Sequence, residues 1–247
     1  MKSIILAGGY GTRLYPLTIN QPKPLLEVAG KPIIEHIVGK IEEISSIDEI
    51  FVVTNAKFYS HFIRWSGNFS STKKIKIIND KTASNEGRLG SLGDIQFVVN
   101  QEKIDDDLLV VAGDNLFEFS LKEIFDFFKQ KNKKTVVVLH DVKDMELAKH
   151  YGIASIGKNS RMVDFFEKPK QPKSTLSSTG VYFYHKSIIK FLLSYGKHGK
   201  NTDKAGNFLE WLYKKDDVYC YVSDKKWYDI GSIEQLTKAR KELEQKE

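Results

Sequence analysis

The chain has 247 residues, a formal net charge of +6 and a single cysteine. This length favours one large domain with an insertion over two full domains, and it buries a core without disulfide staples. Cys220 cannot form an internal disulfide, which fits a reducing compartment. Glycines end the first apolar run at once, unlike a signal peptide, and no run approaches the ~20 residues of a membrane span. We therefore expect a cytoplasmic protein without a membrane partner.

The basic balance suits anionic ligands. The lysines are scattered, however, and the sequence contains no continuous basic helix and no signature of a DNA- or RNA-binding module. Small phosphorylated ligands account for the charge as well as nucleic acid does. We therefore expect no nucleic-acid partner, and a basic nucleic-acid binder is the most distant alternative.

Strand-like and helix-like runs alternate along the chain, which predicts an α/β fold. Continuous apolar runs, typical of a sheet covered by helices on both faces, predict strands at Ile4–Ala7, Ile50–Thr54, Ile75–Ile78, Leu108–Ala112 and Thr135–Leu139. Apolar residues recur at helical spacing after Pro32 and predict a helix from Ile33 to Ile44. Two capping-box patterns predict further helices, one after Ser120 and one after Ser232.

The pattern changes near Tyr151. Short β-like pieces follow it, at Gly152–Ile156, Met162–Phe166 and Gly180–Tyr184. We interpret them as an added β layer over one side of the sheet. The polar stretch from Thr82 to Arg88 predicts a loop.

The most specific segment follows the first strand. It reads Leu6-Ala7-Gly8-Gly9-Tyr10-Gly11-Thr12-Arg13-Leu14 and continues to Pro22-Lys23-Pro24. Glycines directly after a strand allow close backbone approach, and their N–H groups can form a nest for a polyphosphate. Arg13 offers a planar fork for phosphate oxygens and Lys23 a compact mobile charge. A dinucleotide fingerprint is excluded because the prolines forbid a long helix, and the Gly-Lys-Ser/Thr of a Walker loop is absent.

This segment resembles the signature of the sugar-phosphate nucleotidyltransferase family, and similarity extends over essentially the whole chain. The resemblance implies a Rossmann-like mixed sheet with an inserted β-rich sugar-binding region. It implies one domain over residues 1–247, with a nucleotide-binding part of about 1–145 and a sugar-binding part of about 146–235. In that family the glycine-rich loop holds the triphosphate, Arg13 matches a residue that meets the outgoing phosphates, and Lys23 one that meets the reacting phosphates.

Two aspartates are candidate metal ligands. Asp114 comes directly after an apolar strand, where open α/β sheets gather ligands, and Asp229 lies in Trp227-Tyr228-Asp229-Ile230-Gly231. Both match metal-binding aspartates of the resembled family, and Mg²⁺ prefers one or two carboxylates plus phosphate oxygens. We assign catalytic roles to Arg13, Lys23 and Asp114. The six histidines show no ligand spacing, and we interpret them as core or surface residues.

Sugar-side candidates come from the later part of the chain. A carboxylate accepts hydrogen bonds from sugar hydroxyls and a lysine can hold a phosphate. The predicted sugar-phosphate-binding residues are Gly152, Glu167, Lys168, Gly180 and Tyr182. The family asparagine expected shortly before Gly180 is replaced by serines and threonines, so the acceptor can be an unusual sugar or another small phosphate.

The base-reading residues are expected between Asn79 and Gly90. Asn79, Asn85 and Arg88 are polar candidates, and the backbone of Gly90 can approach the base ring. The segment Leu89–Ile95 resembles a glycine-rich loop of the family, but the family often has a small neutral residue where Asp94 stands. The glutamine typical of thymidylyltransferases is absent. Thymidine or uridine triphosphate is the first expectation and cytidine triphosphate the alternative.

We therefore predict a Mg²⁺-dependent enzyme that transfers a nucleotidyl group from a nucleoside triphosphate to a sugar 1-phosphate and releases pyrophosphate. The alternatives are the same transfer to a non-sugar small phosphate and a catalytically silent subunit that binds a nucleotide-sugar. A homo-oligomer is compatible with the sequence.

Overall fold

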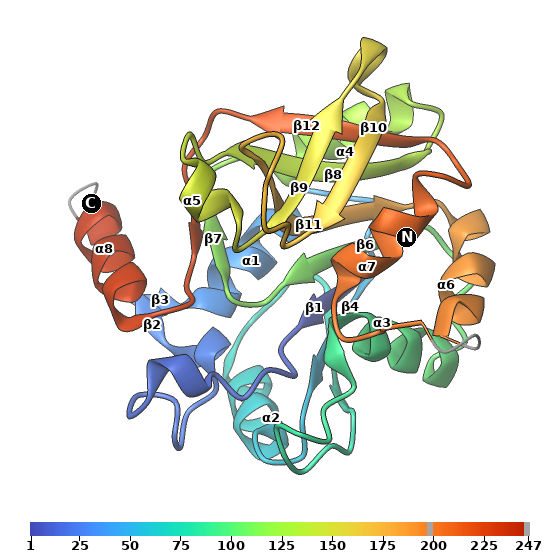
Figure 1. The fold of residues 1–247 in the computed structure, drawn as a ribbon. Helices are drawn as coiled ribbons and strands as arrows, with labels where there is room; N and C mark the ends of the chain where they lie inside the picture. Colours follow the sequence, from blue (N-terminus) through green and yellow to red (C-terminus); the bar gives the residue numbers. More distant parts are fainter. Residues whose placement is uncertain (197–199, 245–247) are drawn as a thin grey trace.

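A computed structural model describes residues 1–196 and 200–244, and its centre is a nine-stranded mixed sheet (Figure 1). The strands are β1 (Lys2–Leu6), β4 (Glu49–Thr54), β5 (Lys74–Asn79), β6 (Leu108–Ala112), β8 (Thr135–Asp141), β9 (Gly152–Ile156), β10 (Met162–Glu167), β11 (Leu176–Tyr184) and β12 (Val218–Ser223). All five strands predicted from continuous apolar runs are confirmed.

The sheet has a parallel half and a mixed half. β5, β4, β1 and β6 are parallel neighbours in that order. β11 then pairs with β6 in the antiparallel direction, β8 pairs antiparallel with β11, and β12 pairs parallel with β8. The carboxyl ends of β1 and β6 therefore meet at one edge, where ligands gather in open α/β sheets.

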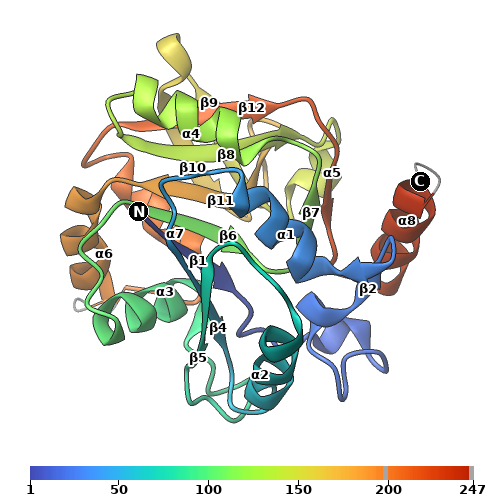
Figure 2. The ribbon, with the colours of Figure 1, turned by 180° about the vertical axis from the view of Figure 1, so that it is seen from behind.

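Helices cover both faces of this sheet, as predicted. One face carries α1 (Ile33–Glu42), α2 (Tyr59–Asn68) and α4 (Leu121–Gln130), whereas α8 (Ile233–Glu244) packs beside the sheet, against β2 (Glu27–Val28) and β13 (Trp227–Asp229). The other carries α3 (Gly90–Gln101), α6 (Ile189–Tyr195) and α7 (Ala205–Leu212). A shorter α5 (Met145–Ala148) precedes β9. Figure 2 shows α1 and α4 lying over the sheet.

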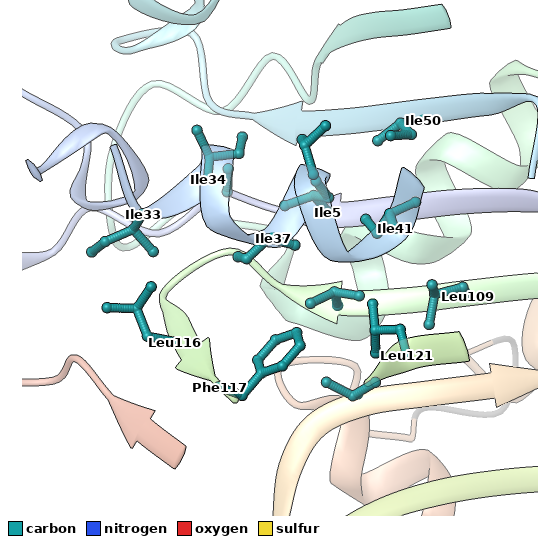
Figure 3. Close-up of a cluster of buried hydrophobic side chains, with 14 of the residues drawn as sticks. Ile5, Ile33, Ile34, Ile37, Ile41, Ile50, Leu109, Leu116, Phe117 and Leu121 are labelled. Carbon is teal, nitrogen blue, oxygen red and sulfur yellow. The ribbon is translucent and has the colours of Figure 1, made fainter. Parts of the chain in front are cut away.

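The predicted helix after Pro32 illustrates why these elements form. Its isoleucines at helical spacing point toward the sheet, where Ile37 and Ile41 lie near Ile5 of β1 and Leu109 of β6 (Figure 3). These side chains are essentially unexposed. Each fully buried aliphatic side chain contributes about 1.5–3 kcal/mol relative to its exposed state. Burial of this face therefore fixes α1 against the parallel half of the sheet.

The two predicted capping patterns are present in part. Ser120 Oγ accepts a hydrogen bond from the Glu123 amide at 3.3 Å, and Ser232 Oγ accepts one from the Gln235 amide at 3.3 Å. Gln235 Oε1 accepts from the amide of Gly231 at 2.8 Å, one residue before the cap. Each helix start is therefore capped by its serine.

The added β layer predicted after Tyr151 is confirmed for β9 and β10, which pair with each other and lie over β8 and β12 in Figure 1. It is wrong for Gly180–Tyr184, which is part of β11. β11 belongs to the main sheet, β9 joins it through Ser177 and Ile153, and β10 pairs with β9. Without β11, the edge of β6 would present unpaired backbone N–H and C=O groups. β11 forms hydrogen bonds with these groups and therefore extends the sheet; it does not cover a face of it. The predicted nucleotide and sugar parts thus share one sheet, and their boundary stays a prediction.

The prediction of a glycine-rich loop over Leu89–Ile95 is also wrong. Gly90 begins α3, and the following residues form its first turns. The preceding stretch from Thr82 to Arg88 is a loop, as predicted.

Two small pairings complete the fold. β2 (Glu27–Val28) pairs with β3 (Lys31–Pro32), and β7 (Asn115–Phe117) pairs with β13 (Trp227–Asp229). Across residues 1–196 and 200–244, the helices are all too short or too polar to span a bilayer.

Candidate active site

The glycine-rich loop leaves β1 at the carboxyl edge of the sheet. The Ala7 amide still donates to Val53 at 2.8 Å, and Asn55 Nδ2 donates to the Gly8 carbonyl at 3.0 Å. Gly11 has a left-handed conformation, with φ of +63°, and its carbonyl accepts from Thr18 Oγ1 at 2.7 Å. A positive φ strains residues with a Cβ, so glycine is needed here. The loop is thereby held open beside the sheet edge.

Asp114 and Asp229 are brought together by the pairing of β7 with β13. Asp229 lies opposite Asn115, and the Ile230 amide donates to the Asp114 carbonyl at 3.2 Å. Trp227 Nε1 donates to Asn115 Oδ1 at 3.2 Å, which adds a side-chain link to the same pairing. Two carboxylates that are 115 positions apart thus face one space.

Positive groups balance these carboxylates. Lys23 Nζ lies 2.5 Å from Asp114 Oδ2 and 2.6 Å from the Ile230 carbonyl oxygen. Burial, and then the charge of Asp114, raises the pKa of Asp229 to about 6, while Lys23 and Arg13 oppose that rise. A cation bound between the two carboxylates would remove this repulsion. The pair therefore suits Mg²⁺, whose remaining ligands would be phosphate and water oxygens.

Two adjoining cavities open around Asp114. One has a volume of about 260 Å³ and is lined by Arg13, Asp114 and Asp229 on one side. The other, of about 220 Å³, runs along the glycine-rich loop. Both are lined by Leu6, Ser91, Ala112 and Asp114. Asp114 therefore lies at the junction, with room for one ligand on each side.

The larger cavity contains every predicted sugar-side residue. Gly152, Glu167, Lys168, Gly180 and Tyr182 all line it. The Glu167 side chain is only 12% exposed. Burial raises the pKa of Glu167, and the nearby charges of Lys204 and Lys168 oppose this shift. Besides Asp114 and Asp229, the cavity thus offers the Glu167 carboxyl and several cations, the groups that bind hydroxyls and phosphate.

The smaller cavity contains part of the predicted nucleotide set. Leu6, Gly8, Gly9, Arg88 and Gly90 line it. Ala7, Gly11 and Thr12 form the backbone that shapes the loop around it. Arg88 forms an ion pair with Asp203 at 3.0 Å.

Asn79 and Asn85 do not line either cavity. Asn79 Oδ1 accepts from the Lys81 amide at 2.8 Å, which stabilises the local turn, and the Asn85 carbonyl accepts from Arg88 at 3.0 Å. A role for these two residues in reading the base stays a prediction.

The segment before α7 supplies a wall that sequence reasoning missed. Ser91 Oγ accepts from the Ala205 amide at 2.7 Å, and the Ser91 amide donates to the Asp203 carbonyl at 2.9 Å. A Cβ at Gly206 would overlap the carboxylate of Glu167. Asp203, Lys204 and Gly206 line the cavities although no motif marks them. Contacts between distant segments reveal them, across 39 positions for Gly206 and Glu167 and across more than 100 for Ser91 with Asp203 and Ala205.

In the described part of the chain, no three or more His, Cys, Asp or Glu side chains gather as a metal cluster. The two aspartates would therefore need oxygen ligands from substrate and water. Of the six histidines, His150 lines the larger cavity and His198 lies outside the described residues.

Known proteins are similar to this chain over nearly its whole length. The family model described as "Nucleotidyl transferase" matches residues 2–246. The "Bifunctional protein GlmU" of Methanocaldococcus jannaschii is 28% identical over 98% of this chain and 54% of its own length. The glucose-1-phosphate adenylyltransferase of Clostridium novyi is 30% identical over 98% of this chain and 66% of its own length. The chain thus spans about half to two thirds of these relatives.

A solved structure from Bacillus anthracis superposes on this chain with a TM-score of 0.85. That protein is provisionally named a glucose-1-phosphate thymidylyltransferase, and its structure was determined in complex with a sucrose. It is 25% identical to this chain, and the match covers 99% of this chain and 95% of that one. The predicted fold class is thereby confirmed, with a mixed sheet covered by helices on both faces. On the family match, which spans nearly every residue, this chain belongs to the Nucleotidyl transferase family.

Proposed function

We propose that this protein transfers a nucleotidyl group from a nucleoside triphosphate to a sugar 1-phosphate, with Mg²⁺, and releases pyrophosphate. The observation that carries the proposal is the position of Asp114, with Lys23 bound to its carboxylate, at the junction of two cavities. A transferase must hold two phosphorylated substrates end to end with the reacting phosphorus between them. The relatives named for nucleotide transfer to glucose 1-phosphate support the choice of acceptor.

The triphosphate would bind in the smaller cavity along the glycine-rich loop. Backbone N–H groups of Gly8, Gly9 and Gly11 are available for anions because the chain turns there without side chains. Arg13 lines the neighbouring cavity, where its guanidinium can follow the leaving pyrophosphate. The base would then point away from Asp114, toward α3.

The sugar 1-phosphate would occupy the larger cavity. Glu167 accepts hydrogen bonds from sugar hydroxyls, and Lys168 holds the phosphate. That phosphate attacks the α-phosphorus in line, forming one P–O bond as the bond to pyrophosphate breaks. A phosphate monoester with a second pKa near ~6 is already an anion at neutral pH, so no general base is needed.

Two phosphates of like charge must come into contact, and the chain supplies the counter-charges. Lys23 is held by Asp114 and the Ile230 carbonyl, directly beside the carboxylate that lines both cavities. Asp114 and Asp229 would hold Mg²⁺, which would supply positive charge to neutralise the charge that develops on the phosphates. The protein residues therefore act by alignment and electrostatic stabilisation.

The test is a matrix of ATP, GTP, CTP, UTP and dTTP against several sugar 1-phosphates, read by pyrophosphate release. We expect release with at least one pair, dependent on both substrates and on Mg²⁺. Choline phosphate serves as a non-sugar phosphate in the same matrix. Release with that acceptor alone, or with none, would contradict the proposal.

A further inference from the structure

Two buried carboxyl groups meet beneath the glycine-rich loop. Asp80 follows β5 and Asp94 lies in the first turns of α3, and their exposed fractions are 4% and 5%. Both face the same point of the loop, because a Cβ at Gly8 would lie 2.5 Å from Asp94 Oδ2 and 3.3 Å from Asp80 Oδ2. Buried carboxyl groups are costly unless a partner compensates them.

Among the residues that the structure describes, only Asp80 of this pair receives hydrogen bonds from other residues, and only at one of its oxygens. Asp80 Oδ1 accepts from the Thr82 amide at 2.6 Å and from Thr82 Oγ1 at 2.8 Å. Within the described residues, neither Asp80 Oδ2 nor Asp94 Oδ1 has a hydrogen-bond partner outside this carboxyl pair. Burial, and then the charge of Asp80, raises the pKa of Asp94 to about 8, so Asp94 keeps its proton at neutral pH. The hydrogen bond between the two side chains accounts for that proton.

Once this proton is shared with Asp80, the other oxygen of Asp94 is an acceptor. Asp94 lines the smaller cavity together with Gly8 and Gly90. Asp114, which lies against Lys23, lines the same cavity. Phosphates are attracted to the lysine and repelled by the carboxyl pair, so we expect the base, and not the phosphates, beside Asp94.

We propose that Asp94, held by Asp80, accepts a hydrogen bond from the exocyclic amino group of the base. The enzyme would then select a triphosphate of guanine, adenine or cytosine over one of uracil or thymine. This inference rests on the proposed function and changes its expected base. Aspartate accepts from a base amino group, whereas the carbonyl of uracil or thymine at the same position would leave two acceptors unpaired.

The test measures binding without any sugar phosphate. The dissociation constants of the five triphosphates are determined by calorimetry with Mg²⁺ for the unmodified protein, Asp94→Ala and Asp94→Asn. Asparagine can donate its amide N–H to Asp80 and keep its carbonyl toward the base, so it mimics the protonated acid. Asp105→Asn, on an exposed loop residue, is the control.

We expect the unmodified protein to bind one amino-bearing triphosphate roughly 10- to 100-fold more tightly than UTP and dTTP. Asp94→Ala should remove most of that preference, while Asp94→Asn and Asp105→Asn keep it. Tighter or equal binding of UTP or dTTP by the unmodified protein would overturn the inference. If Asp94→Ala weakens the binding of all five triphosphates by the same factor, the inference is overturned too, because Asp94 would then only stabilise the glycine-rich loop.

The binding experiment tests the role of Asp94 independently of the proposed transfer reaction. Failure of pyrophosphate release with every acceptor would contradict the transfer reaction, whereas the order of the five dissociation constants would still decide the role of Asp94. If Asp94→Ala does not fold, as judged by circular dichroism, the preference of the unmodified protein and of Asp94→Asn decides alone. Loss of preference in a folded Asp94→Asn protein would likewise contradict the acceptor role.

Discussion

Lys23 and Asp114 form an ion pair of 2.5 Å although they are 91 positions apart, and the Lys23 side chain is only 12% exposed. The flanking Pro22 and Pro24 limit the backbone around the lysine, and the Ile230 carbonyl takes a second hydrogen bond from it. The lysine charge is thus fixed against Asp114, the carboxylate that lines both cavities.

The first prediction concerns this lysine. Lys23→Ala should lower kcat on the order of 100-fold and change the KM for the triphosphate much less, because a charge that neutralises the reacting phosphates acts mainly in the transition state. Steady-state pyrophosphate release measures both constants. Lys122→Ala breaks an ion pair of the same length on the surface of α4 and should leave both unchanged. An unchanged kcat with a raised KM in Lys23→Ala would refute the assigned role.

The second prediction concerns the metal. Asp114→Asn and Asp229→Asn should each lose most of the activity while remaining folded, because asparagine keeps the volume but weakens Mg²⁺ binding. Asp216→Asn, which removes a carboxylate from an ion pair with Lys134 away from both cavities, is the matched control. Activity of the unmodified protein should vanish in EDTA and return with excess Mg²⁺. Full turnover in EDTA would rule out the metal mechanism.

The third prediction separates the acceptor cavity from the nucleotide cavity. Gly206→Ala should raise the KM for the sugar phosphate at least about tenfold, because the added methyl group overlaps the Glu167 carboxylate and displaces a group that is proposed to hold the sugar. The dissociation constant of the triphosphate should stay within about twofold. Gly39→Ala, at an open position of α1, is the control and should be neutral or stabilising. A normal KM in a folded Gly206→Ala protein would show that Glu167 does not contact the acceptor.

The fourth prediction concerns pH and stability without ligands. The pKa of Asp94 is about 8 in the folded protein and 3.8 ordinarily, so the folded state binds more protons between these values. Stability contributed by Asp94 is therefore present at low pH and is lost as the pH rises through that window. The other charged groups that line its cavity are Arg88, Asp114 and Asp203.

Asp94→Asn cannot ionise. The free energy of unfolding of both proteins is measured by urea denaturation from pH 5 to pH 9. The value for Asp94→Asn minus the value for the unmodified protein should increase with pH up to pH 8, by at most about 1.4 kcal/mol per pH unit. Above pH 8 the difference should level off. The Asp105→Asn protein should track the unmodified protein throughout. A difference that does not depend on pH would mean that Asp94 is already ionised in the fold.

Local sequence patterns determined much of the fold. Continuous apolar runs identified the strands of the sheet, and isoleucines at helical spacing identified α1, because secondary structure and burial impose short periods on neighbouring residues. The glycine-rich loop with Arg13 and Lys23 could also be identified from the sequence, since a phosphate-binding loop needs glycines and basic residues close together in the chain. The pairing of Asp114 with Asp229 followed from family resemblance alone.

The tertiary structure decided what lies between distant segments. The sequence does not show that β11 joins the edge of β6, that Gly206 lies against Glu167, or that Asp80 meets Asp94 under Gly8. Each of these contacts joins segments with no common local period, and any of several pairings would bury similar apolar surface. The carboxyl pair shows the reason most clearly. An aspartate in a helical turn is ordinary in sequence, and only the burial of both groups at one point turns it into an acceptor with a shifted pKa.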